Sequence, residues 1–434
     1  MAKKKLIVVS FDAMIREDLD NTQFQPGLDW MMREGARVDH MRSLYPSLTY
    51  PCHVSMASGC YPDKHGVTLN EHRLPGVKNP PWLHMHDAVR VEDILDACKK
   101  AGMVTASVGW PVSGNHPSAD YLIDEMWPKD TGDAAAFRRA YEETGTAPAL
   151  YDAVVAPHIW QRLGRRHPDS SYFYTDCACD IIRLYKPDLL MLHVANMDHY
   201  RHGEGVMNER LRMAAYECDR MIQSLIFATR QAGVYDQTNF VVTSDHGQMN
   251  IVRYVKPNLL LKRHGFMSTD AAGNVTDWRA WCCSAGMSAQ ITLKDPQDKQ
   301  LHEEVYALLC RARDEGVWGI SEVYTNEETR ALEHLDGDFS FVIESDDYSS
   351  FSRDWREPYA VNCPLDTFGR KAGSHGFYPD KGPKSPFICC GPAFRKGAVL
   401  DSARLVDGAP TYARVLGVEL PQADGRVLEE LLAE

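Results

Sequence analysis

Short runs of consecutive apolar residues alternate along the chain with longer segments in which apolar residues recur every three or four positions. The runs are typical of parallel strands that helices cover on both faces, so we expect strands at residues 6–11, 103–109, 189–194, 240–244 and 386–390. Helical spacing predicts helices at residues 91–101 and 207–232, the second of which ends at Gly233. This alternation predicts an α/β fold with a large, mostly parallel central sheet flanked by helices.

Two regions interrupt this rhythm. Residues from about 111 to 170 are rich in proline, glycine, aspartate and aromatic residues, which predicts a cap-like region over one end of the sheet. Within residues 255–350, a hairpin turn at 270–274, a helix near 302–315 and a strand near 339–344 predict a small inserted α+β subdomain. The core domain then comprises residues 1–254 and 351–434.

Composition and charge narrow the class of protein. The chain has 434 residues, of which 44% are hydrophobic and 25% charged, as in ordinary globular proteins. Its apolar runs are shorter than the roughly 18 residues that span a bilayer. Asp12 interrupts the first run too early for a signal peptide, so we expect a cytoplasmic protein without a membrane partner. A net charge of -13 argues against a DNA-binding protein. Twelve cysteines without a CxxC pair predict reduced, mostly buried thiols.

Aspartate and histidine residues lie where several predicted strands end, and one histidine lies shortly before the last strand. Each alone is typical of a turn or a helix cap, but ligands of open parallel sheets bind at the carboxyl ends of the strands. Carboxylate and imidazole groups together suit zinc or manganese, and their number predicts two divalent ions, with zinc favoured. The residues are Asp12, Asp198, His202, Asp245, His246 and His375.

The spacing of Asp198 and His202 is that of neighbours on one helical face, so one turn of helix would direct both side chains to one metal ion. His199 is the competing ligand, although its side chain would point away from Asp198 in such a turn. We therefore prefer His202.

A nucleophile is the remaining requirement for catalysis at such a site. Thr49 lies where the segment before Val54 enters a predicted helix, which is typical of a plain N-cap residue. The same position exposes backbone N–H groups and the helix dipole to a bound anion. A threonine hydroxyl becomes a nucleophile when a divalent metal binds it, so the cap and the nucleophile are compatible roles.

At this point the sequence resembles the nucleotide pyrophosphatase/phosphodiesterase (type I phosphodiesterase) family of the alkaline phosphatase superfamily. The resemblance implies an alkaline phosphatase-like fold. It covers nearly the whole chain and rests on motifs in a fixed order, which are Ser10-Phe-Asp12, Thr49-Tyr-Pro-Cys-His53, Ser58-Gly-Cys-Tyr-Pro-Asp-Lys-His65-Gly66, Asp198-x-x-x-His202, Thr243-Ser-Asp245-His246-Gly247 and Gly373-Ser-His375-Gly376.

The resemblance implies roles for these residues. Asp198, His202 and His375 would hold one metal ion, and Asp12, Asp245, His246 and the Thr49 oxygen would hold the other. It also implies hydrolysis of phosphodiester or phosphoanhydride bonds in nucleotides or related small molecules, through a covalent threonyl-phosphoryl intermediate. Three ligand carboxylates and a Thr49 alkoxide would balance two divalent ions, which favours a monoanionic diester as substrate. The alternatives are a phosphomonoesterase or phosphonate hydrolase of the same superfamily, and a catalytically weak protein that binds metal and nucleotide.

Three positions beside the motifs bear on substrate binding. Tyr50 follows the nucleophile, where family members often place an aromatic ring against the nucleotide base, although it is equally well explained as a packed core residue. Cys52 stands where many members have an asparagine that stabilises developing charge, and a thiol is a far weaker hydrogen-bond donor. Arg201 replaces the usual glycine before His202 and offers a further contact to the substrate.

Overall fold

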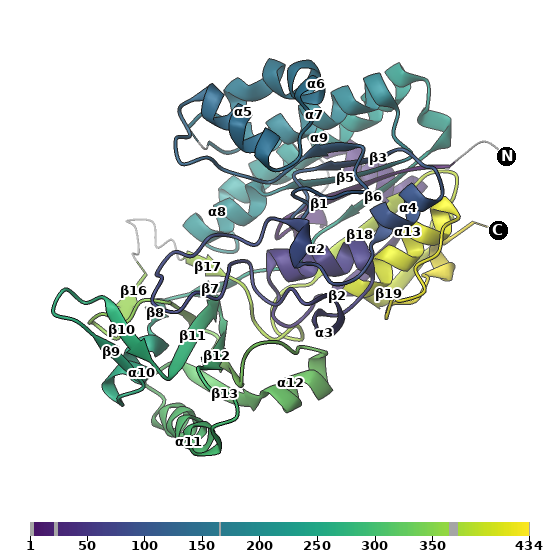
Figure 1. Ribbon diagram of the computed structural model, residues 1–434. Helices are drawn as coiled ribbons and strands as arrows, with labels where there is room; N and C mark the ends of the chain where they lie inside the picture. The colour runs from purple at the N-terminus through teal and green to yellow at the C-terminus, as the bar shows by residue number, and fades with distance from the viewer. Residues whose placement is uncertain (1–3, 21–24, 165, 364–371, 434) are drawn as a thin grey trace.

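The computed structural model describes residues 4–20, 25–164, 166–363 and 372–433. Its centre is an eight-stranded sheet with the order β19-β2-β18-β6-β1-β5-β3-β4 (Figure 1). Strand β18 runs antiparallel to both of its neighbours, and the other pairs in the sheet are parallel. The strands are β1 (Lys5–Phe11), β2 (Ala36–Arg42), β3 (Thr105–Val108), β4 (Tyr121–Ile123), β5 (Leu189–Val194), β6 (Thr238–Thr243), β18 (Ser385–Cys390) and β19 (Val399–Arg404).

Helices cover both faces of this sheet because its central strands are apolar on both sides. In β1, Ile7 and Val9 belong to a buried cluster with the helices of one face, and Leu6 and Val8 to a cluster with those of the other. The first face carries α1 (Pro26–Glu34), α7 (Asp169–Tyr185) and α9 (Glu209–Ala232), and the second carries α2 (Thr49–Ser58), α4 (Ile94–Lys100) and α13 (Gly408–Leu416). The short helices α3 (Pro62–His65) and α8 (Asn196–Glu204) follow α2 and β5.

The segment before α7 forms a layer of short helices beside it. It contains α5 (Ala134–Glu143), α6 (Pro148–Leu150), a π-helical turn at Tyr151–Val155 and a 3-10 segment at Ala156–Gln161. In Figure 1 these elements lie at the top of the molecule, over α7 and α9. Within one buried cluster, Phe137 of this layer stacks on Tyr141, and Tyr141 stacks on Phe173 of α7.

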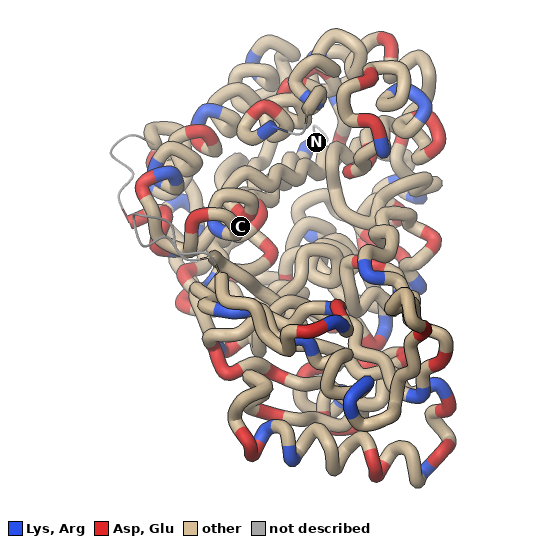
Figure 2. Tube along the Cα trace, turned by 90° about the vertical axis from the view of Figure 1, so that its left-hand side faces the viewer, with Lys and Arg blue, Asp and Glu red and all other residues tan. Residues whose placement is uncertain are grey.

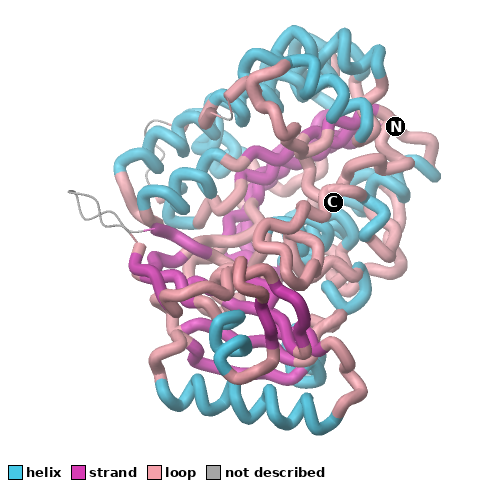
Figure 3. Tube along the Cα trace, turned by 60° about the vertical axis from the view of Figure 1, so that its left-hand side comes forward, coloured by secondary structure: helices cyan, strands magenta, loops and turns pink. Residues whose placement is uncertain are grey.

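A second, smaller sheet follows β6 in the chain. Its four antiparallel strands have the order β11-β12-β14-β13, and helices lie beside them (Figure 3). The strands are β11 (Ala280–Ala285), β12 (Ser288–Leu293), β13 (Ile320–Thr325) and β14 (Phe341–Ser345), and the helices are α10 (Pro257–Arg263), α11 (Lys299–Glu315) and α12 (Asn326–Glu333). Short strand pairs surround it: β9 (Met267–Thr269) with β10 (Val275–Trp278), β8 (Arg253–Val255) with β15 (Ser349–Phe351) and β16 (Ala360–Asn362), and β7 (Met249–Ile251) with β17 (Ala372–Ser374).

The expected α/β fold with an inserted α+β region is confirmed, and each predicted strand of the large sheet is present. One prediction was wrong: we grouped β18 with the parallel strands, but it runs antiparallel to its neighbour β6. Strands β2, β4 and β19 were not predicted, because polar positions interrupt β2, β4 has only three residues and most positions of β19 are exposed.

Three sequence expectations concern the surface and the thiols. Acidic and basic residues are interspersed over the whole molecule (Figure 2). Among the described helices, none is long and apolar enough to cross a membrane. All twelve cysteines are free thiols, and all but Cys310 are buried, which confirms the expectation of reduced thiols.

A buried carboxyl group joins the smaller sheet to the loop that leads into α2. Glu344 of β14 is 1% exposed and accepts hydrogen bonds from the Tyr45 hydroxyl at 2.9 Å and the Tyr378 N–H at 3.0 Å. The Lys381 Nζ lies 3.3 Å from the same carboxyl group. Burial raises the pKa of Glu344 to about 7, although Lys381 acts to lower it.

This raised pKa predicts that part of the folding stability is lost as the pH rises from about 4.5 to 7. In that interval the folded chain keeps a proton on Glu344 that the unfolded chain has released, so the free energy of unfolding falls with pH. A shift from 4.5 to about 7 corresponds to at most about 3 kcal/mol. Urea unfolding at several pH values should show this fall in the wild type and a flatter profile in Glu344→Gln. Parallel profiles would show that Glu344 titrates normally.

Candidate active site

Asp198, His202 and His375 form one compact group at the carboxyl end of the large sheet. Asp198 and His202 project from α8, directly after β5, and His375 follows β17. The Asp198 Oδ1 lies 3.2 Å from the His202 Nε2 and 3.9 Å from the His375 Nε2. Asp198 and His202 therefore lie on one helical face, as predicted. His375, which follows the inserted region in the sequence, completes the group.

Asp12, Asp245 and His246 form a second group beside the first. Asp12 follows β1, and Asp245 and His246 follow β6, which is the neighbour of β1 in the sheet. The His246 Nε2 lies 3.1 Å from the Asp245 Oδ2 and 3.7 Å from the Asp12 Oδ1. The Thr49 Oγ1 lies 3.3 Å from the same nitrogen. The rings of His246 and His375 stack with their centres 3.9 Å apart, so the two groups adjoin.

The donor atoms of both groups fit divalent metal ions. The Asp12 Oδ1 and the Asp245 Oδ2 are buried and have no hydrogen-bond partner among the described residues. Burial, followed by the neighbouring Asp245 carboxylate, raises the pKa of Asp12 well above its ordinary value. Burial likewise raises the pKa of Asp245 to about 7. Two such carboxylates facing each other without a cation are costly, and divalent ions would neutralise them.

Backbone carbonyls fix the orientation of the histidines. The Nδ1–H group of His202 donates to the Gly373 carbonyl at 2.9 Å, and that of His375 donates to the Ser47 carbonyl at 3.0 Å. The Nε2 atom of each ring is then directed at Asp198 and, in the neutral imidazole, is available to a metal ion. This arrangement is typical of histidine ligands to zinc, whose second ring nitrogen donates to an oxygen atom outside the site.

A further layer of contacts holds the carboxylates. The Gln248 amide donates to the Asp198 Oδ1 at 2.6 Å, and the Ala13 N–H donates to the Asp245 Oδ1 at 3.1 Å. The His193 Nε2 lies 3.1 Å from the Asp12 Oδ2. These contacts leave the Asp12 Oδ1 and the Asp245 Oδ2 facing the site, because they occupy the opposite oxygen of each carboxylate.

Thr49 is the first residue of α2, and Leu48 occupies the N-cap position without a side-chain hydrogen bond to the helix. The alternative role of Thr49 as an N-cap is therefore not realised in this structure. The His53 Nδ1 bonds to the Thr49 carbonyl at 2.7 Å, and the His53 Nε2 contacts the Ser10 hydroxyl at 2.9 Å, which ties the start of α2 to β1. The Thr49 hydroxyl thus lies at a helix N-terminus, where backbone N–H groups favour an anion.

Two cavities adjoin the two ligand groups. One, of about 660 Å³, contains Thr49, Tyr50 and Asp198 together with residues of the segment before α7. The other, of about 240 Å³, contains His202, His375 and residues of the inserted region. A substrate bound at Thr49 therefore has room for one of its substituents in the larger cavity.

The structure places Cys52 and Arg201 outside both cavities and His199 outside both ligand groups. The Cys52 thiol is fully buried, 3.3 Å from the Ser43 hydroxyl, and it lines neither cavity, so the expected contact with substrate is not made. Arg201 is also fully buried, with its Nη2 2.6 Å from the Asp18 carboxylate and its Nε donating to the Ala13 carbonyl, which corrects the expected substrate contact. His199 lines the larger cavity and belongs to neither ligand group.

Sequence reasoning missed Asn70, which occupies the place beside the nucleophile. Its side-chain oxygen accepts a hydrogen bond from the Tyr50 N–H at 2.9 Å, and it lines the smaller cavity with His202 and His375. The contact fixes the amide orientation and leaves the Nδ2 as a donor. Asn70 lies 21 positions after Thr49 in a loop without a local motif, so the sequence alone offers no signal for it.

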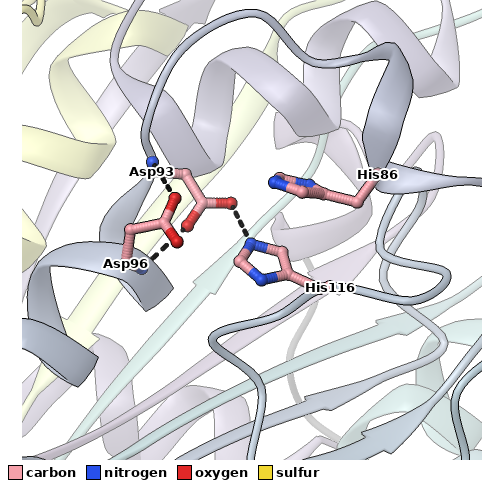
Figure 4. Close-up of side chains that lie close together, drawn as sticks. All are labelled: His86, Asp93, Asp96 and His116. Carbon is pink, nitrogen blue, oxygen red and sulfur yellow. Dashed lines mark hydrogen bonds and ion pairs between the residues drawn. The ribbon is translucent and has the colours of Figure 1, made fainter.

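A third group of acidic and histidine residues lies outside this site (Figure 4). The His116 Nε2 lies 3.0 Å from the Asp93 Oδ2, and the Ser118 N–H donates to the His116 Nδ1 at 3.0 Å. The Asp96 Oδ2 accepts from the Asp93 N–H at 3.1 Å in a capping box at the start of α4. The His86 ring packs against the His116 ring in a tilted arrangement. Because both nitrogens of His116 are occupied and its Nε2 carries the hydrogen, we assign this group to the stability of α4 and not to metal binding.

Comparison with known proteins decides the family. The model of the type I phosphodiesterase / nucleotide pyrophosphatase family matches residues 6–377. The chain belongs to this family. It is 24% identical over 426 residues to the bis(5'-adenosyl)-triphosphatase enpp4 of Xenopus laevis, a match that covers 95% of this chain and 78% of that protein. It is 23% identical over 447 residues to ectonucleotide pyrophosphatase/phosphodiesterase family member 7 of Rattus norvegicus, covering 99% of this chain and 87% of the relative.

Solved structures of the phosphodiesterase family confirm the fold. Murine ectonucleotide pyrophosphatase/phosphodiesterase 5 aligns with a TM-score of 0.70 at 18% identity, covering 99% of this chain and 100% of that one. An inactive variant of the murine protein, in complex with AMP, aligns with a TM-score of 0.69 at 17% identity, covering 99% of this chain and 100% of that one. The expected alkaline phosphatase-like architecture is thereby confirmed, and the relatives are hydrolases of phosphodiester and phosphoanhydride bonds.

Proposed function

We propose that this protein hydrolyses phosphodiester or phosphoanhydride bonds in nucleotides or related small molecules with two divalent ions, most favourably zinc. The observation that carries the proposal is the position of the Thr49 hydroxyl, at the N-terminus of α2 and 3.3 Å from the His246 Nε2. There it faces buried carboxylates whose inner oxygens have no partner among the described residues. A nucleophile, two ligand groups and a helix N-terminus converge on one point.

The two groups divide the ligands as the family resemblance implies. Asp198, His202 and His375 would hold one ion, and Asp12, Asp245, His246 and the Thr49 oxygen would hold the other. Two bound ions would lower the pKa of the threonine hydroxyl and stabilise negative charge on the attacking and leaving oxygens. Zinc is favoured over magnesium because three of the seven ligands are imidazoles.

The chain itself supplies the nucleophile and its alignment. The Thr49 Oγ1 forms a bond to phosphorus while the bond to the leaving oxygen breaks on the opposite side, which gives a threonyl-phosphoryl intermediate. Water then forms a bond to phosphorus, and the bond to the Thr49 Oγ1 breaks. The contact of His53 with the Thr49 carbonyl and the extended Leu48 hold the hydroxyl in line for both displacements.

Asn70 is placed to stabilise charge on the phosphoryl oxygens during both steps. With its oxygen occupied by the Tyr50 N–H, its Nδ2 is a fixed donor beside the nucleophile. Loss of one such donor costs on the order of a hundredfold in kcat. We expect Asn70→Ala to lower kcat by about that factor with a smaller change in KM, measured by steady-state kinetics. An equal rise in KM at unchanged kcat would instead assign Asn70 to substrate binding.

Three observations support a nucleotide diester as substrate. The Xenopus relative is named for hydrolysis of bis(5'-adenosyl) triphosphate, and the murine neighbour was solved with AMP. The larger cavity is walled by the rings of Tyr50, Trp82, Trp127 and Tyr174, which suit a planar base. The site carries three ligand carboxylates, so two divalent ions and a Thr49 alkoxide leave it near neutral, as a monoanionic diester requires. The cytoplasmic location expected from the sequence stays a prediction.

The experiment that tests this function compares two substrates on the zinc-loaded protein. The p-nitrophenyl ester of thymidine 5′-phosphate should be hydrolysed with a kcat/KM at least tenfold above that of p-nitrophenyl phosphate. A preference for the monoester would favour a phosphomonoesterase. No turnover of either by protein that contains zinc would favour a protein that binds metal and nucleotide without catalysis.

A further inference from the structure

The larger cavity extends from Thr49 to a second polar end that the proposed reaction does not use. This end is formed by Arg162, which follows the short helices, and by Ser170 and Ser171 in the first turn of α7. All three side chains are at least 98% buried. The Arg162 Nη1 and the hydroxyls of both serines have no hydrogen-bond partner among the described residues. Buried polar atoms that lack a partner and line a cavity indicate a polar ligand.

Arg162 is held rigidly, and its charge is not neutralised. Its Nε donates to the Tyr141 hydroxyl at 3.1 Å, its Nη2 donates to the Met126 carbonyl at 2.6 Å, and the guanidinium lies 3.5 Å from the centre of the Trp127 ring. In the described part of the chain it forms no ion pair with a carboxylate. A fully buried cation is normally paired with an anion, because an isolated charge is costly to remove from water.

The nearest candidate partner in the cavity does not neutralise Arg162. Glu125 lies in the same cavity, and no ion pair joins it to Arg162 within the described residues. Burial raises the pKa of Glu125 to about 8, which favours the protonated, uncharged form of this carboxyl group. Arg162 thus remains the uncompensated charge at this end of the cavity.

The serines place further hydrogen-bond donors near Arg162. Ser170 and Ser171 lie one helical turn before Tyr174, on the same side of α7, and the Arg162 guanidinium lies 4.7 Å from the centre of the Tyr174 ring. Helix α7 has 17 residues, so its first turn also carries the positive end of a full helix dipole. A buried guanidinium, two hydroxyls and a helix N-terminus together suit an anion.

We propose that Arg162, Ser170 and Ser171 bind a second anionic group of the substrate, a carboxylate or a phosphate monoester, while the diester phosphorus lies at Thr49. The proposal rests on the proposed function and narrows the class of substrates. The favoured substrates are diesters whose substituent in the larger cavity ends in an additional negative charge. The aromatic walls between the two ends would hold the planar or apolar part of that substituent.

Binding to the full-length zinc-loaded protein tests this proposal without turnover. Isothermal titration calorimetry should show that thymidine 3′,5′-bisphosphate binds about tenfold or more tightly than thymidine 5′-phosphate, if the second group is a phosphate. The same gain for 4-carboxybenzyl phosphate over benzyl phosphate would identify a carboxylate. Equal affinities within both pairs would overturn the proposal. Because no bond is broken, this result stands even if the protein fails to hydrolyse diesters, which would contradict the proposed function instead.

Variants separate recognition from a structural effect. The double variant Ser170→Ala/Ser171→Ala should lose most of the gain from the second anionic group. It should bind the member of each pair that has only one anionic group within about twofold of wild type. Ser385→Ala is the matched control, because its hydroxyl is also buried without a described partner but lies on β18, outside both cavities. A variant that keeps the full gain, or that loses affinity equally for both members, would contradict the role of the serines.

Discussion

Thr49→Ala is expected to lower kcat for a nucleotide diester by at least about 10⁴-fold, because it removes the atom that attacks phosphorus. The side chain is 7% exposed and its hydroxyl faces His246, so the substitution removes a hydroxyl and a methyl group from the site without disturbing the core. Both metal ions should remain bound, since six side-chain ligands are untouched. Steady-state rates and metal content per chain, measured on one preparation, check both statements.

Thr49→Ser is the matched control for this prediction. A serine at the first position of α2 keeps an attacking hydroxyl and should retain activity within about a hundredfold of wild type. If alanine and serine variants were equally impaired, the threonine methyl group would matter as much as its hydroxyl. If the alanine variant kept more than a tenth of the wild-type rate, Thr49 would not be the nucleophile.

Removing the metal ions is expected to have an effect of similar size. A chelator should lower kcat by at least about 10³-fold, and added zinc should restore it, because bound ions are needed to neutralise the carboxylates and stabilise the reacting oxygens. In Asp245→Asn, whose inner oxygen has no partner among the described residues, zinc content should fall from two ions to about one per chain. Elemental analysis and activity titrated against zinc give the two readouts.

Gln248→Ala is the control for the metal prediction, because it should weaken zinc binding without removing a ligand. Gln248 donates to the Asp198 Oδ1 and is itself no ligand, so its loss should weaken zinc affinity by roughly tenfold to a hundredfold and leave two sites. Full activity of chelated protein that is free of metal by elemental analysis would rule out the two-metal chemistry.

The strands that could be predicted from the sequence are those buried on both faces. β5 shows this best, since all six of its residues are buried and its predicted range equals its observed one. β2 could not be predicted in the same way, because His40 and Asp39 interrupt its apolar positions. The antiparallel direction of β18 could not be predicted either. It depends on how the chain returns from the inserted region into the large sheet, and the local apolar run of β18 carries no information about it.

The candidate site was predictable where its residues follow strands in sequence. Asp12 follows β1 directly and Asp245 lies two residues after the end of β6, and neighbouring parallel strands bring such residues together. Asn70 and Arg162 had no such signal, because both lie in irregular segments and reach the site through long-range packing. The contact expected of Cys52 failed for a related reason. Its side chain lies about one helical turn after Thr49 and is buried in the cluster that α2 forms with the large sheet, whereas the Thr49 hydroxyl faces His246.

The covalent role of Thr49 is the central claim, and the stereochemistry at phosphorus tests it most directly. A nucleotide diester made chiral at phosphorus with sulfur can be hydrolysed in ¹⁸O-labelled water, and the configuration of the product determined by ³¹P NMR. Two successive in-line displacements, first by Thr49 and then by water, predict net retention of configuration. Net inversion would show a single direct attack by water and would contradict the threonyl-phosphoryl intermediate.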